Sequence, residues 1–201
     1  MALRWCCHLL YPSVDTVEEA YPMTVESRMQ VIEEQIRIIE DFPKPGILFR
    51  DITTLLKHPL AMGATILEMK NFCERQGATV IAGVEARGFI FGTPVAQALE
   101  LPFIPIRKAG KLPRETVSCS YQLEYGEATI ELHKEDVTPD DKVVIIDDLL
   151  ATGGTLLASA SLLRDVGASV IGCSVVINLD DLGGRSAIEN AGLELHSILT
   201  Y

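Results

Sequence analysis

The stretch of sequence that decides the fold is Val143-Val144-Ile145-Ile146-Asp147-Asp148-Leu149-Leu150-Ala151-Thr152-Gly153-Gly154-Thr155. Its first four residues are all β-branched, which is typical of a strand buried on both faces of a parallel sheet. Two acids follow at the carboxyl end of this predicted strand. The glycine-rich segment after them is predicted to turn and open a helix. A strand, a turn and a helix in this order predict an α/β fold.

The two acids and the turn fit the binding of a phosphorylated sugar. Asp147 and Asp148 stand at the sheet edge where open α/β proteins bind ligands, and carboxylates there can accept hydrogen bonds from sugar hydroxyls. Because adjacent strand residues point to opposite faces, we expect a loop bend to bring the two side chains together. Residues 152–155 would offer a phosphate the free N–H groups and positive dipole end of a helix.

Two other interpretations of this segment are possible. The acids alone are compatible with an ordinary strand exit, and the turn alone with an ordinary helix cap. The segment also lacks the Gly-Lys-Ser/Thr ending of a Walker loop. Hydrolysis of nucleoside triphosphates is therefore disfavoured, and the joined pattern favours a phosphosugar site.

Length, charge and cysteine content narrow the class of protein. The chain has 201 residues, 48% of them hydrophobic, which is enough to bury one core, and we expect a single domain at residues 23–201. A net charge of −11 argues against nucleic acid or membrane partners. The five cysteines show no paired metal spacing, which favours a reducing cytoplasm. Residues 1–22 show no sustained pattern and are interpreted as an amino-terminal extension before Met23, or alternatively as a packed arm.

The order of predicted elements supports a parallel sheet. An apolar stripe at helical spacing predicts a first helix that ends before two prolines, and it consists of Val25, Met29, Ile32, Ile36 and Ile39. Further helices are predicted at 60–76, 91–100 and 154–166, and strands at 79–83, 103–106, 143–147, 169–178 and 193–199. Their alternation predicts βαβ units. Residues 118–133 alternate about Gly126 and predict a projecting hairpin.

Two further segments carry positive charge. Arg87 lies in Gly83-Val84-Glu85-Ala86-Arg87-Gly88-Phe89, directly after a predicted strand, where it could grip a diphosphate by a bidentate fork or simply be solvated. The second segment, Arg107-Lys108-Ala109-Gly110-Lys111-Leu112-Pro113-Arg114, has the composition of a mobile cationic lid or of a solvated loop.

These motifs together resemble a known family. The run at 143–155 resembles the 5-phosphoribosyl 1-pyrophosphate (PRPP) motif of type I phosphoribosyltransferases. Residues 41–51, 107–113 and 123–126 narrow the resemblance to the adenine phosphoribosyltransferases within that family, and it extends over residues 24–201. The resemblance implies an α/β fold with a mostly parallel central sheet flanked by helices, a small hood and a projecting β-hairpin lid.

The resemblance also implies roles for individual residues. Asp147 and Asp148 would hold the ribose of PRPP, and Glu85, Ala86, Arg87, Lys108 and Lys111 its diphosphate, with a cis peptide near Glu85. The 5-phosphate would be held by Ala151, Thr152, Gly153, Gly154 and Thr155. Adenine would meet main-chain groups of Leu48 and Arg50 and lie between the side chains of Phe49 and Leu179. Arg87 and Lys111 would stabilise the leaving group, and Glu124 would handle a proton.

The implied reaction is purine salvage, in which adenine and PRPP give AMP and pyrophosphate. The resemblance further implies Mg²⁺ held mainly by PRPP and water, without a dedicated protein cage, and a cytoplasmic homodimer. Three alternatives stay open at this point: transfer to another purine, a PRPP-binding regulator, and a catalytically silent scaffold.

Overall fold

The fold is described from a computed structural model, which covers residues 23–122 and 126–201. The predicted extension at residues 1–22 lies outside this part of the chain. The contacts divide the chain into two compact units, one ending at Leu67 and the other spanning Glu68–Tyr201. Each unit is described by itself, and the single domain expected from the sequence stays a prediction.

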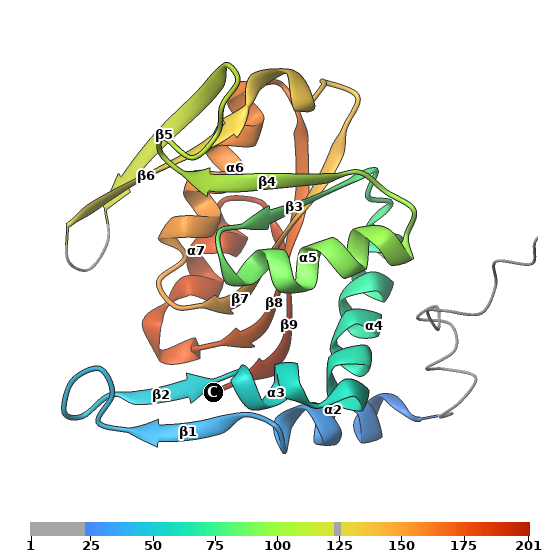
Figure 1. Ribbon diagram of the computed structural model, residues 1–201, viewed down its shortest axis with the longest axis vertical. Coiled ribbons are helices and arrows are strands. Elements are labelled where there is room, and N and C mark those ends of the chain that lie inside the picture. The colour runs from blue at the N-terminus through green and yellow to red at the C-terminus, as the bar shows by residue number, and fades with distance from the viewer. Residues whose placement is uncertain (1–22, 123–125) are drawn as a thin grey trace, which may run out of the picture. The chain divides into compact units, whose positions relative to one another are not determined.

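The second unit is built on a seven-stranded sheet with the order β5-β6-β4-β3-β7-β8-β9 (Figure 1). Strands β4, β3, β7, β8 and β9 run parallel to one another, whereas β6 is antiparallel to β4 and β5. The strands span Val80–Val84 (β3), Phe103–Lys108 (β4), Thr116–Gln122 (β5), Glu127–His133 (β6), Lys142–Leu150 (β7), Ser169–Asn178 (β8) and Glu194–Thr200 (β9). The predicted fold class is confirmed.

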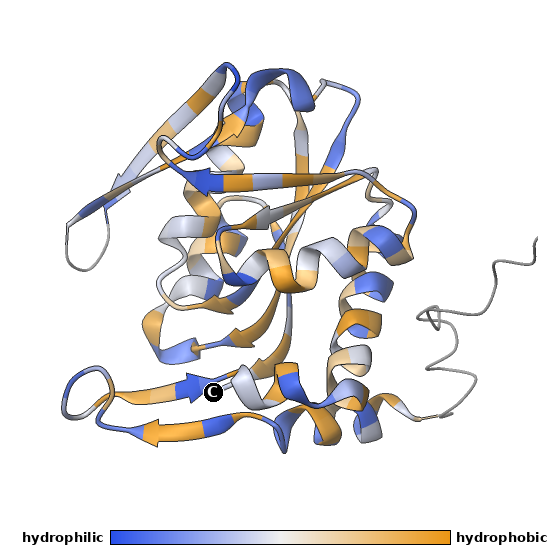
Figure 2. Cartoon of the chain, viewed as in Figure 1, coloured by the Kyte–Doolittle hydropathy of each residue, from blue (hydrophilic) through white to orange (hydrophobic). Residues whose placement is uncertain are grey.

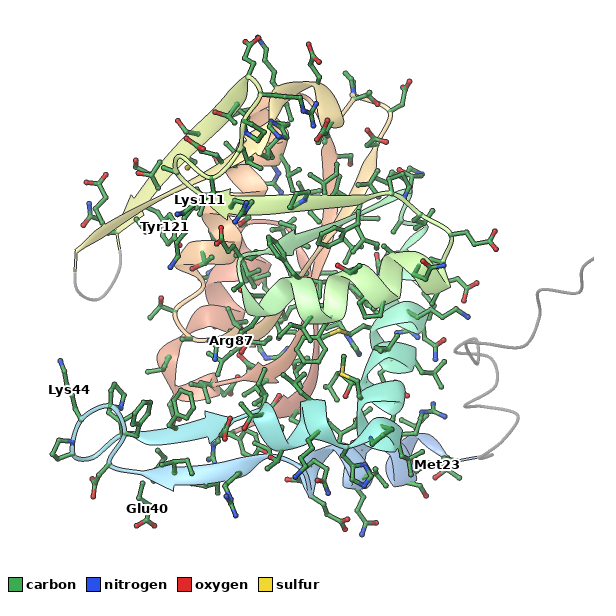
Figure 3. All side chains as sticks on the ribbon, viewed as in Figure 1. Met23, Glu40, Lys44, Arg87, Lys111 and Tyr121 are labelled. Carbon is green, nitrogen blue, oxygen red and sulfur yellow. The ribbon has the colours of Figure 1, made fainter. Side chains whose placement is uncertain are left out.

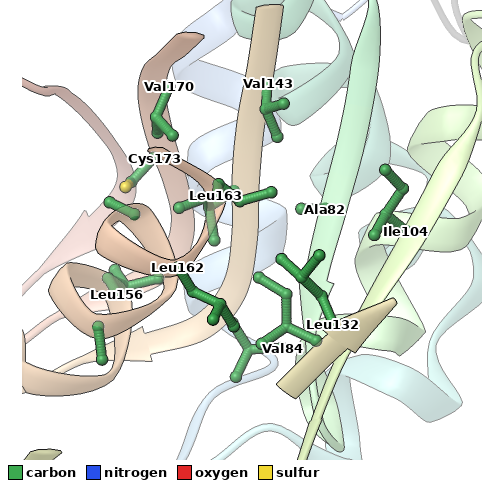
Figure 4. Close-up of a cluster of buried hydrophobic side chains, with 14 of the residues drawn as sticks. Ala82, Val84, Ile104, Leu132, Val143, Leu156, Leu162, Leu163, Val170 and Cys173 are labelled. Atoms are coloured by element: carbon green, nitrogen blue, oxygen red, sulfur yellow. The ribbon is translucent and has the colours of Figure 1, made fainter. Parts of the chain in front are cut away.

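Helices cover both faces of this sheet. Consecutive strand residues point to opposite faces, and Val143 and Ile145 belong to a buried cluster that includes Leu162 and Leu163 of α6 (Figure 4). Helix α5 packs against β3 and β7. The helices are α4 (Pro59–Gln76), which begins in the first unit, α5 (Arg87–Ala98), α6 (Gly154–Asp165) and α7 (Gly184–Asn190), with short 3-10 turns at Lys134–Asp136 and Asp180–Leu182.

The β-branched run of the motif strand lies in the centre of this core. Val143, Val144, Ile145 and Ile146 are all 0% exposed. Apolar residues follow the central strands in Figure 2, as expected for strands that are covered on both faces. Within the described part of the chain, no helix is both long and apolar enough to cross a membrane.

The predicted hairpin is present and extends the sheet. Strands β5 and β6 pair from Thr116 opposite His133 to Gln122 opposite Glu127. The end of β4 pairs with β6 through Arg107 opposite Glu131. In Figure 1 the far end of the hairpin stands away from the other strands. The cationic segment therefore begins where the parallel strands meet the hairpin.

The first unit corrects one prediction. Helix α2 spans Val25–Glu33, and the chain then enters strand β1 (Arg37–Glu40), which pairs antiparallel with β2 (Leu48–Asp51). The helix predicted to continue to Ile39 is therefore wrong at its carboxyl end. Ile36, Ile38 and Ile39 are β-branched and favour a strand once a partner is available. Helix α3 (Thr53–Lys57) follows β2.

Candidate active site

A cavity of about 290 Å³ lies in the second unit, where strands β3, β4 and β7 end. Residues of hairpin β5–β6 and of the turn before α6 complete its wall. Ligands of open α/β sheets bind at this edge. All the residues predicted to bind PRPP line this cavity except Lys111: Glu85, Ala86, Arg87, Lys108, Asp147, Asp148, Ala151, Thr152, Gly153, Gly154 and Thr155.

The acidic pair lies inside strand β7 instead of in a loop. The strand continues to Leu150, which pairs with Asn178 of β8, so the expected loop bend is absent. The strand continues past the acids because β8 supplies backbone hydrogen-bond partners there. Both acids nonetheless line the cavity. The Asp148 N–H donates to Oδ1 of Asp147 over 2.9 Å.

Arg87 makes an ion pair with the second acid. Its Nε lies 3.1 Å from Oδ2 of Asp148. The Asp148 side chain is 4% exposed, whereas the Arg87 side chain is 49% exposed. The two atoms are close, but their angle does not make a hydrogen bond, and Oδ2 of Asp148 has no hydrogen-bond partner among the described residues. A buried acceptor at a cavity wall is available to a ligand that can displace the arginine.

Burial changes the protonation of both acids. Burial, and then the negative charge of Asp148, raise the pKa of Asp147 well above its ordinary value. Burial also raises the pKa of Asp148, against the opposing effect of the Arg87 guanidinium. The unliganded site therefore disfavours two full negative charges side by side. Cationic or hydrogen-bond-donating ligands would relieve that cost.

Glu85 ties the loop after β3 to the end of β4. Its carboxylate accepts from Nε of Arg107 over 3.2 Å and from the N–H of Lys108 over 3.0 Å. Burial works to raise the pKa of Glu85, but the hydrogen bond from Lys108 and the interactions with Arg107 outweigh it, so that the pKa lies below its ordinary value. The peptide between Glu85 and Ala86 is cis, as the family resemblance implied. Helix α5 begins directly after it, at Arg87 and thus earlier than predicted.

The predicted phosphate turn opens α6 as expected. Gly153 precedes the helix with a φ of +88°, in the left-handed region that favours glycine. The first turn of α7 supports this turn from outside the cavity. A Cβ atom added to Gly184 would overlap the carbonyl oxygen of Ala151 and lie 2.8 Å from Cδ1 of Leu150. The close approach of these two segments requires glycine at position 184.

The cationic segment is held at several points. Nη1 of Arg107 donates to the carbonyl of Lys111 over 3.0 Å, and the N–H of Gly110 donates to Oε2 of Glu131 over 3.0 Å. Arg114 pairs with Asp136 at 2.7 Å. Lys108 lines the cavity, whereas Lys111 is exposed and lies outside its lining. Closure of this segment as a lid stays a prediction.

Comparison with known proteins identifies the family. A model of the phosphoribosyl transferase domain matches residues 53–197. An adenine phosphoribosyltransferase from Yersinia pestis (strain Pestoides F) is 47% identical over 174 residues, covering 87% of this chain and 93% of that protein. This chain belongs to the adenine phosphoribosyltransferase family.

Solved structures agree with this assignment. The crystal structure of adenine phosphoribosyltransferase from Rhodothermus marinus gives a TM-score of 0.81 at 41% identity and covers 88% of this chain and 99% of that chain. The Saccharomyces cerevisiae protein, complexed with an imino-altritol bisphosphate and adenine, gives a TM-score of 0.82 at 33% identity, covering 87% of this chain and 99% of that chain.

The residues expected to hold adenine fall in both units. Leu48, Phe49 and Arg50 belong to β2 of the first unit, where the Phe49 ring packs edge-on against Phe42 with centroids 5.1 Å apart. Leu179 follows β8 in the second unit, and its N–H donates to the carbonyl of Leu150 over 2.9 Å. Glu124 lies outside the described residues. For this adenine phosphoribosyltransferase family member, the roles of all five residues stay predictions.

Sequence reasoning missed Tyr121 of β5. Its side chain lines the cavity, and its hydroxyl lies 3.1 Å from Oγ1 of Thr155. The alternation in the hairpin placed Tyr121 on a strand face, but it did not indicate which face or what lies opposite. The pattern of one strand carries no information on a partner 34 residues away.

Proposed function

We propose that this protein transfers the 5-phosphoribosyl group of PRPP to adenine, giving AMP and pyrophosphate. The observation that carries the proposal is the convergence of three groups in one cavity: the acids of β7, the free N-terminus of α6 and the cation Arg87. Each suits a different part of PRPP. The acids suit ribose hydroxyls, the helix end suits the 5-phosphate, and the arginine suits the diphosphate.

The ribose is held by Asp147 and Asp148. Their carboxylate oxygens accept hydrogen bonds from its two neighbouring hydroxyls, and Arg87 then leaves Asp148 for the diphosphate. The exchange is balanced, because the buried acid and the half-exposed arginine each gain a new partner as they lose the old one. It also explains why a half-exposed cation is paired with a buried acid.

The chemistry consists of positioning and charge stabilisation. As pyrophosphate leaves, C1 of the ribose becomes cationic, and N9 of adenine attacks from the opposite face. The negative acids favour the developing cation, while Arg87 and Lys111 stabilise the negative charge on the leaving group. Holding both partners in line contributes up to roughly 7–11 kcal/mol.

By the family resemblance, the side chains of Phe49 and Leu179 contact the adenine ring, and main-chain groups of Leu48 and Arg50 bind its edge. Flat apolar walls with a few fixed hydrogen-bonding groups suit a purine. Glu124 exchanges a proton with the imidazole side of the base, whose nitrogens change basicity as the glycosidic bond forms. The support for these assignments is the resemblance of residues 41–51 and 123–126 to adenine phosphoribosyltransferases.

The residues at the cavity fit Mg²⁺ bound together with the substrate. The described part of the chain contains no group of three or more His, Cys, Asp or Glu side chains that could hold a metal. Mg²⁺ commonly takes one or two carboxylates and fills its remaining positions with substrate phosphates and water. On this proposal PRPP and water supply most of the ligands of Mg²⁺, without a dedicated protein cage. The ion would neutralise charge on the diphosphate.

The protein is further proposed to act as a homodimer in the cytoplasm, with only PRPP, adenine and their products as ligands. The family resemblance supports the dimer. The net charge of −11 supports the absence of nucleic acid and anionic membrane partners.

The test is release of pyrophosphate from PRPP in the presence of Mg²⁺ and, in parallel, adenine, hypoxanthine, guanine or xanthine. Turnover with adenine alone, lost in Asp147→Ala and Asp148→Ala variants that still fold, is the expected result. Turnover with an oxopurine would retain the PRPP site and overturn the assignment of the base. PRPP binding without turnover on any base would favour a regulator.

A further inference from the structure

Tyr121 reaches the phosphate turn from the opposite side of the cavity. It lies in β5, and its hydroxyl is 3.1 Å from Oγ1 of Thr155 in the first turn of α6. Both side chains line the cavity. Figure 3 shows Tyr121 on the hairpin that stands over this part of the unit. The proposed function so far gives this tyrosine no role.

The tyrosine is held in place by its surroundings. Its ring packs against the buried cluster beneath the hairpin, and its strand position is fixed by pairing with Ala128 of β6. The turn itself lies close beneath: a Cβ atom on Gly154 would be 3.6 Å from Cδ2 of Tyr121 and 3.5 Å from the carbonyl oxygen of Gln122. The Tyr121 hydroxyl is therefore held near Thr155 by a side chain that is fixed by packing.

The chemistry of phosphate decides the direction of this hydrogen bond. A phosphate dianion only accepts hydrogen bonds, so a Thr155 hydroxyl that binds it must donate its single proton to it. Oγ1 of Thr155 can then only accept, and the Tyr121 hydroxyl is positioned to donate to it. In the unliganded site either hydroxyl can be the donor. Phosphate binding thus selects one of two orientations.

We propose that Tyr121 is a positioning residue for the 5-phosphate of PRPP, because its O–H donates to Thr155 and leaves the Thr155 O–H directed at the phosphate. The inference rests on the proposed function, in which residues 151–155 hold that phosphate. Linked hydrogen bonds polarise one another, so the bond from tyrosine strengthens the one that threonine gives to the anion.

The test measures two ligands that occupy different ends of the PRPP site. Ribose 5-phosphate carries the 5-phosphate, whereas pyrophosphate occupies the end near Arg87. Calorimetry with Tyr121→Phe is expected to show binding of ribose 5-phosphate weakened about fivefold, the net worth of one hydrogen bond, with pyrophosphate binding unchanged. Tyr201→Phe, which changes a tyrosine outside the cavity lining, is the matched control and should leave both affinities unchanged.

A second variant separates action through Thr155 from direct contact with the phosphate. If Tyr121 acts through Thr155, then Tyr121→Phe added to Thr155→Val has little further effect on the affinity for ribose 5-phosphate. Thr155→Ser retains the hydroxyl and should retain the affinity.

Three outcomes would overturn the inference. They are full additivity of the two losses, an equal loss for both ligands in Tyr121→Phe, and no loss at all in that variant. Failure of the proposed function has a different signature, which is that the wild-type protein itself does not bind ribose 5-phosphate. The inference about Tyr121 would be lost in that case as well.

Discussion

Arg87 and Asp148 form an ion pair at the cavity wall, with Nε and Oδ2 separated by 3.1 Å. The acid is buried and the arginine is half exposed, so the acid is fixed while the cation can turn toward a ligand. Asp148 would bind the ribose and Arg87 the diphosphate on the proposed function. On that proposal, the two recognition groups are ion-pair partners of each other in this structure.

Replacing Arg87 by lysine should weaken pyrophosphate binding about tenfold. Lysine keeps the positive charge but loses the planar fork that can bind two oxygens at once. The measurement is calorimetric titration with pyrophosphate. Arg114→Lys is a suitable control, since Arg114 is similarly exposed and is paired with Asp136 outside the cavity lining. Unchanged pyrophosphate binding in Arg87→Lys would show that Arg87 contributes only its positive charge, and equal losses in both variants would show that the effect is not specific to the cavity.

Asp147→Asn should make the protein more stable at pH 7 and much less active. Folding raises the pKa of Asp147, so the stability that this group contributes is present below its unfolded pKa of about 3.9 and is lost as the pH rises through the folded value. Its ionised form therefore costs stability at neutral pH. A rise in Tm of roughly 2–4 °C is expected, as about 1 kcal/mol produces in a chain of this size.

Thermal unfolding between pH 4 and pH 8 checks this prediction. The gain in Asp147→Asn should shrink as the pH approaches 4, because the wild-type carboxyl then becomes neutral. Asp51→Asn serves as the contrasting control, since hydrogen bonds from Thr53 lower the pKa of Asp51 and its charge favours the folded state. That variant should show no gain in Tm. A loss of stability in Asp147→Asn at pH 7 would contradict the account of the acidic pair.

Much of the second unit could be predicted because its signals are local. Four β-branched residues before Asp147 indicate a buried strand, and the range predicted for β8 agrees with Ser169–Asn178. The segments expected to bind phosphate and diphosphate could be singled out because a glycine turn or a basic loop after a strand is visible in a short window. Eleven of the residues expected to bind PRPP, some from these local patterns and the others from the family resemblance, line one cavity.

The remaining features depend on partners distant in the sequence. Ile36 and Ile39 continue a helical stripe, but in the structure Ile39 pairs with Phe49 of β2. Helical periodicity contains no information about such a strand partner. The bond between Tyr121 and Thr155 and the close approach of Gly184 to Ala151 are contacts of the same kind. These contacts arise from how the elements pack, so they cannot be predicted from any single segment of the sequence.

Gly184→Ala should lower kcat/KM for PRPP at least tenfold. The added methyl group would overlap the carbonyl oxygen of Ala151. Because this oxygen belongs to the main chain, no side-chain rotation can relieve the overlap, and the phosphate turn is displaced. Gly192→Ala is the matched control. Gly192 has a φ of +73° with open space around it, so alanine there strains the backbone without touching the turn.

Steady-state kinetics and thermal unfolding of both glycine variants separate the two effects. Both should lower Tm, and only Gly184→Ala should raise the KM for PRPP. If Gly192→Ala lowers kcat/KM to the same extent, the loss reflects general destabilisation and the support role of Gly184 is refuted.

Lys111→Ala should lower kcat about tenfold if Lys111 reaches the leaving pyrophosphate during the reaction. Its side chain lies outside the cavity lining, so a large effect on turnover would indicate movement of the cationic segment. Lys134→Ala, in which an exposed lysine paired with Glu115 is lost, controls for the change in net charge. Unchanged turnover in Lys111→Ala would remove this lysine from the mechanism.

The central claim is tested most directly by one competition experiment, in which the protein is supplied with PRPP, Mg²⁺ and equal concentrations of adenine and hypoxanthine. Chromatography then measures the nucleotides formed, and a coupled assay measures pyrophosphate in the same sample. The account predicts AMP as the nucleotide product, matched mole for mole by pyrophosphate. Formation of IMP in comparable amount, or release of pyrophosphate without any nucleotide, would contradict it.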